Sequence, residues 1–231
     1  MARNHDDSES AGPTRKTIAD GLSRRDMLKY SASSVAAGAV ALGLDGGGVQ
    51  VASAADGEVT DIDVLNFALS LELLETEFYA RGFDKFDRQD FQQAEFLRGA
   101  GDKLRSRVFD DVSKIRENED IHAEVLREVI EDRGGEPVSK LEYEFPLDTV
   151  DEFVQTARDI ENTGVTAYNG AISLIDDPEL QTKAATIVTV EARHGAFLNF
   201  LVDRSPFPDA FDGTRTRAEV LDIVDQFIVD D

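Results

Sequence analysis

The stretch Glu191-Ala192-Arg193-His194 lies inside an apolar helical pattern that runs from Thr189 to Val202. A second Glu-x-x-His motif, Glu119-Asp120-Ile121-His122, lies well upstream. Residues three apart share one face of a helix, so each motif can aim a carboxylate and an imidazole at the same point. The chain has three histidines, and the third, His5, lies in the N-terminal leader. Two such motifs facing each other predict a site for two metal ions.

Four long helical patterns carry and surround these motifs, each with apolar residues at three- and four-residue spacing. They are predicted over 61–82, 107–133, 149–175 and 178–203. An irregular crossover from Gly135 to Asp148 separates the second helix from the third. In a four-helix bundle, a connection of this length lets the next helix start at the far end. No strand pattern is present, so we predict an all-α, up-down-down-up four-helix bundle with a long crossover between helices two and three.

The fourth helix is apolar on almost every side, which predicts deep burial. Burying Glu191, Arg193 and His194 on such a helix without partners costs free energy, which predicts a purpose for all three. Asp177 followed by Pro178 is a start signal for this helix, and Thr60 or Asp61 can cap the first. The remaining predictions are a connection with a short helix over 84–105 and a tail over 204–231, in which an extended segment (205–211) precedes a short helix (217–228).

Two further acidic residues interrupt apolar stripes. Glu72 on the first helix and Glu161 on the third each lie seven residues before a tyrosine, Tyr79 and Tyr168. Charged groups are rarely buried without a partner, so we predict both glutamates as additional metal ligands. The alternative is a solvated charge, which is the usual state of a glutamate on a helix of an acidic protein. The predicted ligand set is Glu72, Glu119, His122, Glu161, Glu191 and His194.

Three residues are predicted to lie just outside these ligands: Tyr79, Tyr168 and Glu75. The alternative for the tyrosines is ordinary core packing. Glu77, in contrast, is predicted to point into solvent.

The composition limits the chemistry. The chain has no cysteine, which excludes disulfides, thiolate metal sites and thiol catalysis. Oxygen and nitrogen ligands suit iron, manganese and zinc. The net charge is −23, and because acidic and basic residues balance within 1–54, the excess lies in the remainder. Such a surface repels nucleic acid and anionic membranes. It favours a protein that works at high salt, with an ordinary acidic soluble protein as the alternative.

The leader contains Ser23-Arg24-Arg25-Asp26-Met27-Leu28-Lys29, which resembles a twin-arginine export signal. A mild apolar run, Ala32 to Leu44, follows and is too short to span a membrane. Ala52-Ser53-Ala54 then supplies a cleavage site, with a mature start near Ala55. We therefore predict a signal peptide over 1–54, a mature domain over 55–231, recognition by the twin-arginine machinery, and export. Alternatives are an uncleaved anchor and a basic patch followed by a linker.

Around the six predicted metal ligands, the chain resembles the ferritin-like superfamily. Leu65-Asn66, Glu72-Leu73 and Tyr79 are similar to the first helix of bacterioferritin-type proteins. Further similarity, to exported ferritin-like proteins that include desiccation-related ones, is carried by Glu161-Asn162-Thr163-Gly164-Val165, Val190-Glu191-Ala192-Arg193-His194 and Ser205-Pro206-Phe207-Pro208-Asp209-Ala210-Phe211. The resemblance covers roughly 60–231. It implies a ferritin-like bundle with a di-iron site.

These features favour a redox metalloprotein with two iron ions, or manganese, that acts on O2, peroxide or Fe²⁺. Glu119 and Glu191 would bridge or chelate, Glu72 and Glu161 would cap or bridge, and each remaining histidine would hold one metal. One alternative is a non-enzymatic protein that protects the cell envelope during desiccation or salt stress. A manganese catalase is a narrower one. The insertion at 84–105 and the tail depart from cage-forming ferritins, which argues against a 24-subunit cage and leaves a homo-dimer as the predicted assembly.

Overall fold

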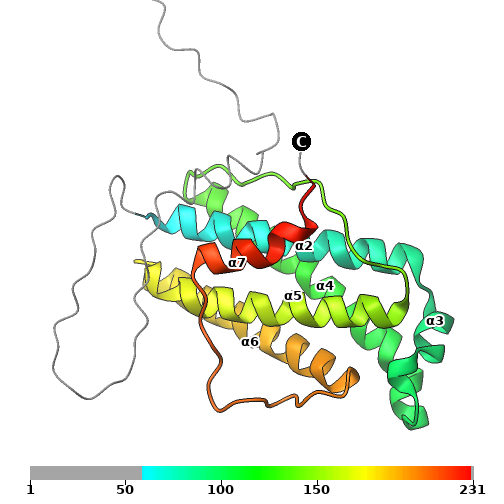
Figure 1. Cartoon of the computed structure of the whole chain (residues 1–231). Helices are drawn as coiled ribbons and strands as arrows, with labels where there is room; N and C mark the ends of the chain where they lie inside the picture. The colour runs from blue at the N-terminus through cyan, green and yellow to red at the C-terminus, as the bar shows by residue number, and fades with distance from the viewer. Residues whose placement is uncertain (1–58, 230–231) are drawn as a thin grey trace, which may run out of the picture.

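The computed structural model describes residues 59–229, so the predicted export signal and cleavage site lie outside the described residues. Four long helices form the bundle, and shorter helices occupy one end and one side (Figure 1). The long helices are α2 (Asp61–Lys85), α4 (Asp102–Asp132), α5 (Val150–Ala171) and α6 (Pro178–Leu201). The short elements are α3 (Arg88–Gln93), α7 (Arg217–Val224) and the 3₁₀ turns η1 (Glu95–Leu97), η2 (Ile172–Leu174) and η3 (Asp225–Phe227). The all-α prediction is confirmed.

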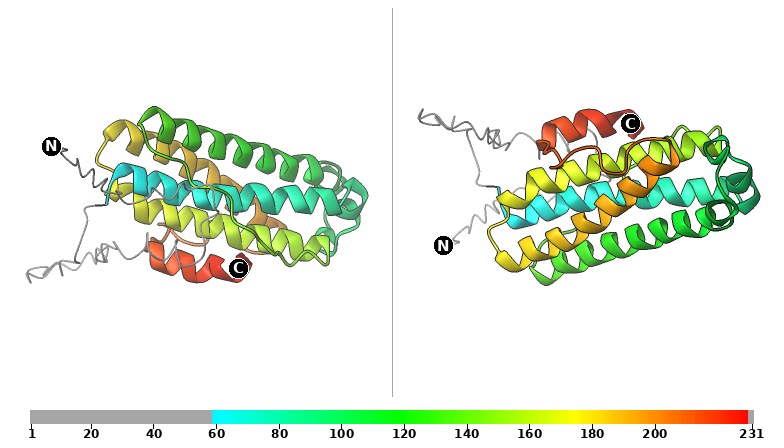
Figure 2. Two further views of the ribbon diagram at one scale, coloured as in Figure 1. Left: turned by 90° about the horizontal axis from the view of Figure 1, so that it is seen from above. Right: turned by 90° about the horizontal axis from the view of Figure 1, so that it is seen from below.

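The ends of the four helices show which way each one runs. The Asp61 carboxylate, at the start of α2, accepts hydrogen bonds from the backbone N–H groups of Asp176 and Asp177, between α5 and α6. Arg133, just after α4, forms a 2.7 Å ion pair with Asp177. The starts of α2 and α6 therefore meet the ends of α4 and α5 at one end of the bundle (Figure 2). This is the predicted up-down-down-up arrangement.

The crossover between α4 and α5 runs along the length of the bundle without a helix of its own (Figure 1). Asn66 of α2 fixes its first part: its amide donates to the Glu136 carbonyl at 3.1 Å and accepts from the Val138 N–H at 2.8 Å. Arg81 donates to the Tyr143 carbonyl further along at 2.7 Å. These side-chain bonds satisfy backbone groups that no helix or sheet satisfies.

Several helix boundaries differ from the prediction. α5 ends at Ala171 instead of Ile175, and the 3₁₀ turn η2 follows it. α2 continues through Gly82 to Lys85, because Gly82 is a packing residue and not a stop signal: a Cβ there would lie 2.1 Å from the Phe153 ring. α4 begins at Asp102 instead of Arg107, directly after Gly101, so the polar connection is shorter than expected. It still contains the predicted short helix, α3, capped by the Asp87 carboxylate. The predicted caps Thr60 and Asp177 are both present.

The prediction that α6, being apolar on almost every side, is deeply buried is wrong for its outer face. Its buried residues form one face, which includes Ala184, Ile187 and Leu198, whereas Lys183 and Arg193 are exposed. The apolar character of the outer face came largely from alanine and valine, whose small side chains expose little apolar surface to solvent. Arg193 is therefore an exposed charge on the outer face of α6 and not a buried one.

The tail is part of the packed structure. α7 lies against α5, and Val220, Val224 and Phe227 join the main apolar core. The approach is close: a Cβ on Gly170 of α5 would lie 2.0 Å from the Arg215 carbonyl oxygen. The final α-helix ends at Val224, and a 3₁₀ turn extends to Phe227. None of the helices within residues 59–229 has the length and apolarity to cross a membrane.

Two apolar clusters fill the bundle and leave a polar layer between them. On α4, the first cluster includes Val108, Val112 and Ile115, and the second includes Ala123, Leu126 and Ile130. Glu119 and His122 lie between the two. The same order holds on α6, where Glu191 and His194 separate Ile187 from Leu198. Both Glu-x-x-His motifs thus lie at mid-bundle, shielded from water at both ends.

Candidate metal centre

The six predicted ligand residues converge in this polar layer. All four glutamates have no exposed surface, and the two histidines are 8% and 5% exposed. Their donor atoms form two groups, within each of which all atoms lie within 4.8 Å of one another. The first group, here called the His122 half, is Glu72, Glu119, His122 and Glu191. The second, the His194 half, is Glu119, Glu161, Glu191 and His194.

Each half is centred on an imidazole nitrogen. Nδ1 of His122 lies 2.9 Å from Glu191 Oε1, 3.1 Å from Glu119 Oε2 and 3.5 Å from Glu72 Oε2. Nδ1 of His194 lies 2.8 Å from Glu119 Oε1 and 4.0 Å from Glu191 Oε1. Glu119 and Glu191 belong to both halves. A carboxylate shared in this way is positioned to bridge two cations and to offset their mutual repulsion.

Two buried tyrosines hold the outer glutamates. Tyr79 Oη donates to Glu161 Oε1 at 2.6 Å, and Tyr168 Oη donates to Glu72 Oε1 at 2.5 Å. Burial raises the pKa of both hydroxyls well above the usual value, so they remain donors. Each bond leaves the second oxygen of its glutamate facing a histidine: Glu161 Oε2 lies 3.2 Å from His194 Nδ1. The tyrosines therefore orient the carboxylates as well as fill the core.

The acids and imidazoles compensate one another's charge. Burial disfavours protonation of the histidines, but contacts with the surrounding carboxylates outweigh it and raise the pKa of His122 to about 12 and of His194 to about 9. Burial also opposes ionisation of Glu119, yet contacts with both histidines lower its pKa to about 2. Burial raises the pKa of Glu72 to about 7 and that of Glu191 well above its usual value. Any cation entering the cluster therefore competes with protons for the same atoms.

The donor set fits a pair of divalent cations. Four of the buried carboxylate oxygens have no hydrogen-bond partner, namely Glu72 Oε2, Glu119 Oε1 and both oxygens of Glu191. The imidazole nitrogens lie near them but are not aligned for hydrogen bonds. Buried acceptors without donors cost free energy, and a cation that takes them as ligands removes that cost. Carboxylate and imidazole donors suit iron, manganese and zinc.

Glu75 is a fifth buried carboxylate, 2% exposed, that borders the cluster without belonging to either half. It lies one helical turn after Glu72. Gly164 of α5 leaves room for it, since a Cβ there would lie 3.2 Å from Glu75 Oε1 and 3.6 Å from Glu191 Oε2. Burial, together with the charge of Glu191 and the other glutamates, raises the pKa of Glu75 well above its usual value.

Replacing Glu75 with glutamine is expected to stabilise the metal-free protein, and increasingly so as the pH rises. The folded protein must keep Glu75 protonated, whereas the unfolded chain ionises it near its usual pKa of 4.5. Folding then takes up a proton, and this costs up to about 1.4 kcal/mol per pH unit above that value. Chemical unfolding of Glu75→Gln at pH 5 and pH 8 should show a gain mainly at pH 8. The exposed control Glu128→Gln should show no such trend, and an equal gain at both pH values would contradict the account.

One contact of the site was not predicted from the sequence. Asn118 Nδ2 lies 3.0 Å from His194 Nε2, the ring nitrogen that faces away from the shared carboxylates. A side-chain amide can donate or accept, so it can hold the ring in either protonation state. Its position directly before Glu119, and one turn before His122, is the signal that could have identified it.

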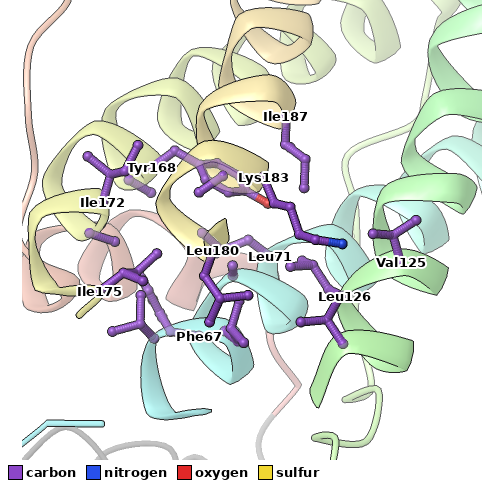
Figure 3. Close-up of a pocket in the computed structure, with 17 residues that line it drawn as sticks. Phe67, Leu71, Val125, Leu126, Tyr168, Ile172, Ile175, Leu180, Lys183 and Ile187 are labelled. Atoms are coloured by element: carbon purple, nitrogen blue, oxygen red, sulfur yellow. The ribbon is translucent and has the colours of Figure 1, made fainter. Parts of the chain in front are cut away.

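A small apolar cavity lies about one helical turn from the His122 half (Figure 3). Ala68, Leu126 and Ile187 line it, and each lies four residues from a member of the cluster on its own helix. Its volume of about 30 Å³ has room for one or two water-sized molecules. Tyr168 forms part of the wall and Lys183 lies at the edge (Figure 3). A cavity with such a lining favours a small apolar guest over water.

A family model described as a ferritin-like domain matches residues 60–204. The matched span contains the four helices of the bundle and all six residues of the cluster, and it ends before α7. No curated protein matches the chain.

Proposed function

The chain belongs to the ferritin-like family, and from this premise we propose that its buried cluster holds two metal ions, iron in the first place, for redox chemistry with O2 or peroxide. The observation that carries the proposal is the pair of shared carboxylates. Glu119 and Glu191 belong to both halves of the cluster, and three of their buried oxygens lack hydrogen-bond partners. Buried acids arranged in this way destabilise the fold unless cations compensate them.

Each residue of the cluster would have a distinct role in binding the two metals. His122 and His194 would each hold one metal, Glu72 and Glu161 would each cap one, and Glu119 with Glu191 would bridge the two. Bound in reduced form, the two metals would supply two electrons for the reduction of O2 or peroxide, and the oxidised pair would accept electrons from incoming Fe²⁺. The tyrosine hydroxyls fix the capping carboxylates, and the two apolar clusters exclude water. The small cavity beside the His122 half suits O2, which is apolar.

The proposal is tested by loading the protein with Fe²⁺ without air and then admitting O2 or peroxide. Consumption of either oxidant, together with the optical signature of a coupled ferric pair, is expected. A manganese-loaded sample that releases O2 from peroxide would instead identify a catalase. Metal content near zero after reconstitution would rule out both.

A second candidate is a non-enzymatic protein that protects the cell envelope under desiccation or salt stress. It is favoured by one observation: the acids and imidazoles already compensate one another, as the close His122–Glu191 and His194–Glu119 contacts indicate. This candidate gains if the His122→Ala/His194→Ala variant folds and protects dried vesicles as well as the parent chain does. It is excluded if protection depends on bound metal.

We propose further that the protein is exported in folded form through the twin-arginine machinery and acts at high salt as a homo-dimer. Replacing Arg24 and Arg25 together with lysine is expected to retain the full-length chain inside the cell, because the machinery reads the arginine pair. Fractionation followed by immunoblotting measures the effect. A variant in which Arg3 and Arg15, both outside the motif, become lysine controls for the substitution itself. Unchanged export of the Arg24→Lys/Arg25→Lys variant would contradict the assignment.

A further inference from the structure

A groove between α4 and α6 leads from the surface to the His194 half of the cluster. Its volume is about 560 Å³, within the range of small-molecule sites. α6 lies near α4 at its start and runs away from it toward Leu201, as the right view of Figure 2 shows. The groove lies in the diverging part, between Lys103 to Asn118 of α4 and Arg193 to Phe200 of α6.

The charge of this groove is opposite to that of the protein. Four cationic side chains line it, and Asp111 is the single acidic residue among its lining residues; the cations are Lys103, Arg107, Lys114 and Arg193. The chain as a whole has 47 acidic residues against 24 basic ones, so a local excess of cations is unexpected on this surface. A patch of one sign in a field of the other attracts ligands of complementary charge.

Two of the four cations are free to meet a ligand. Arg107 forms an ion pair with Asp111, and Lys114 forms one with Glu117. Within residues 59–229, neither Lys103 nor Arg193 is ion-paired to a carboxylate. Arg193 is the charged residue of the Glu-x-x-His stretch that the metal cluster does not use.

The floor of the groove is apolar. Leu104 and Ile115 from α4 lie with Phe197 and Phe200 from α6 among its lining residues. Phe200 is 54% exposed, so its ring offers apolar surface to a ligand in the groove. A groove with cations and exposed aromatic rings favours a ligand that carries a negative charge on an apolar body.

The inner end of the groove reaches the candidate metal centre. Asn118 and His194 both line it, and the asparagine amide contacts the histidine ring at 3.0 Å. A molecule held in the groove would therefore lie beside the ring that faces Glu119 and Glu161. Repulsion by the four cations disfavours this route for Fe²⁺.

We propose that this groove binds a small organic anion, a carboxylate with an aromatic or aliphatic body, and presents it to the His194 half of the cluster. Lys103 and Arg193 bind the carboxylate, and Phe197 and Phe200 cover the apolar part. Binding in the groove does not require metal. The role of the bound anion as a reactant or metal ligand rests on the proposed function.

The experiment uses the full chain after chelator treatment, titrated with benzoate at constant ionic strength and followed through backbone amide NMR shifts. Saturable shifts are expected, largest in 103–118 and 193–200, with a Kd of about 5 mM or tighter. Benzamide keeps the ring without the charge, and inorganic phosphate keeps charge without the ring. Each should bind at least about ten-fold more weakly than benzoate, a difference of about 1.4 kcal/mol.

Matched variants locate the site. Lys103→Gln/Arg193→Gln should weaken benzoate binding about ten-fold, in line with the strength of charge-assisted contacts. Lys183→Gln, which removes an exposed charge of α6 outside the groove, should leave it unchanged. The proposal is overturned if no saturable shift appears, if benzamide or phosphate binds as well as benzoate, or if the double variant binds normally. Metal content, measured separately, keeps this outcome distinct from failure of the metal site.

Discussion

Glu191→Ala is expected to lose both metal ions, whereas His194→Ala is expected to keep about one of the two per chain. Glu191 belongs to both halves of the cluster, so its removal takes a ligand from each site and leaves no second bridge beside Glu119. His194 belongs to one half, and its removal leaves the Glu72, Glu119, His122 and Glu191 group intact. Metal analysis of dialysed, reconstituted protein measures the difference.

The exposed Glu179 at the start of α6 supplies the control for this pair of variants. Glu179→Ala should retain about two metals per chain, like the parent. Equal loss of metal in the Glu191 and His194 variants would contradict the assignment of Glu191 as a shared ligand. It would mean that the two halves fill only together.

Saturation with metal is expected to raise the unfolding midpoint of the protein by about 15 °C or more. A ligand present at 1,000 times its Kd stabilises the folded state by about 4 kcal/mol per site, if the unfolded chain does not bind it. Each kcal/mol corresponds to about 2–4 °C for a chain of 150–250 residues. The gain should be large because metal also satisfies the unpartnered oxygens of Glu72, Glu119 and Glu191. Calorimetry with and without Mn²⁺ measures it.

The double variant His122→Ala/His194→Ala separates this effect from binding to surface carboxylates. Its midpoint should move by less than about 3 °C upon metal addition, because exposed acids bind divalent cations weakly. A shift as large as that of the parent chain would place the stabilising metal outside the cluster.

Much of the fold could be predicted because the local signals agree with one another. Apolar spacing, the caps at Thr60 and Asp177 and the long crossover all point to the same bundle. The prediction was wrong at Gly82 and on the outer face of α6. Gly82 resembles a helix stop, but its role depends on Phe153, which is distant in sequence and reaches it only in the folded state.

The convergence of the six side chains could also be anticipated, because buried charges stand out within apolar stripes. Their detailed contacts could not. Tyr79 and Glu72 lie on one helix, as do Tyr168 and Glu161, but each tyrosine bonds the glutamate of the other helix. The packing of α2 against α5 determines which glutamate each tyrosine contacts. The cationic groove could not be predicted either, because its lining residues come from α4 and α6, which are distant in sequence and adjacent only in the folded protein.

The most direct test of the central claim is anomalous diffraction from crystals grown with Fe²⁺ or Mn²⁺. The account predicts two peaks in the polar layer, about 3.5–4 Å apart. One should lie beside His122 and Glu72, the other beside His194 and Glu161, with Glu119 and Glu191 between them. Peaks confined to exposed carboxylates, with none inside the bundle, would contradict it.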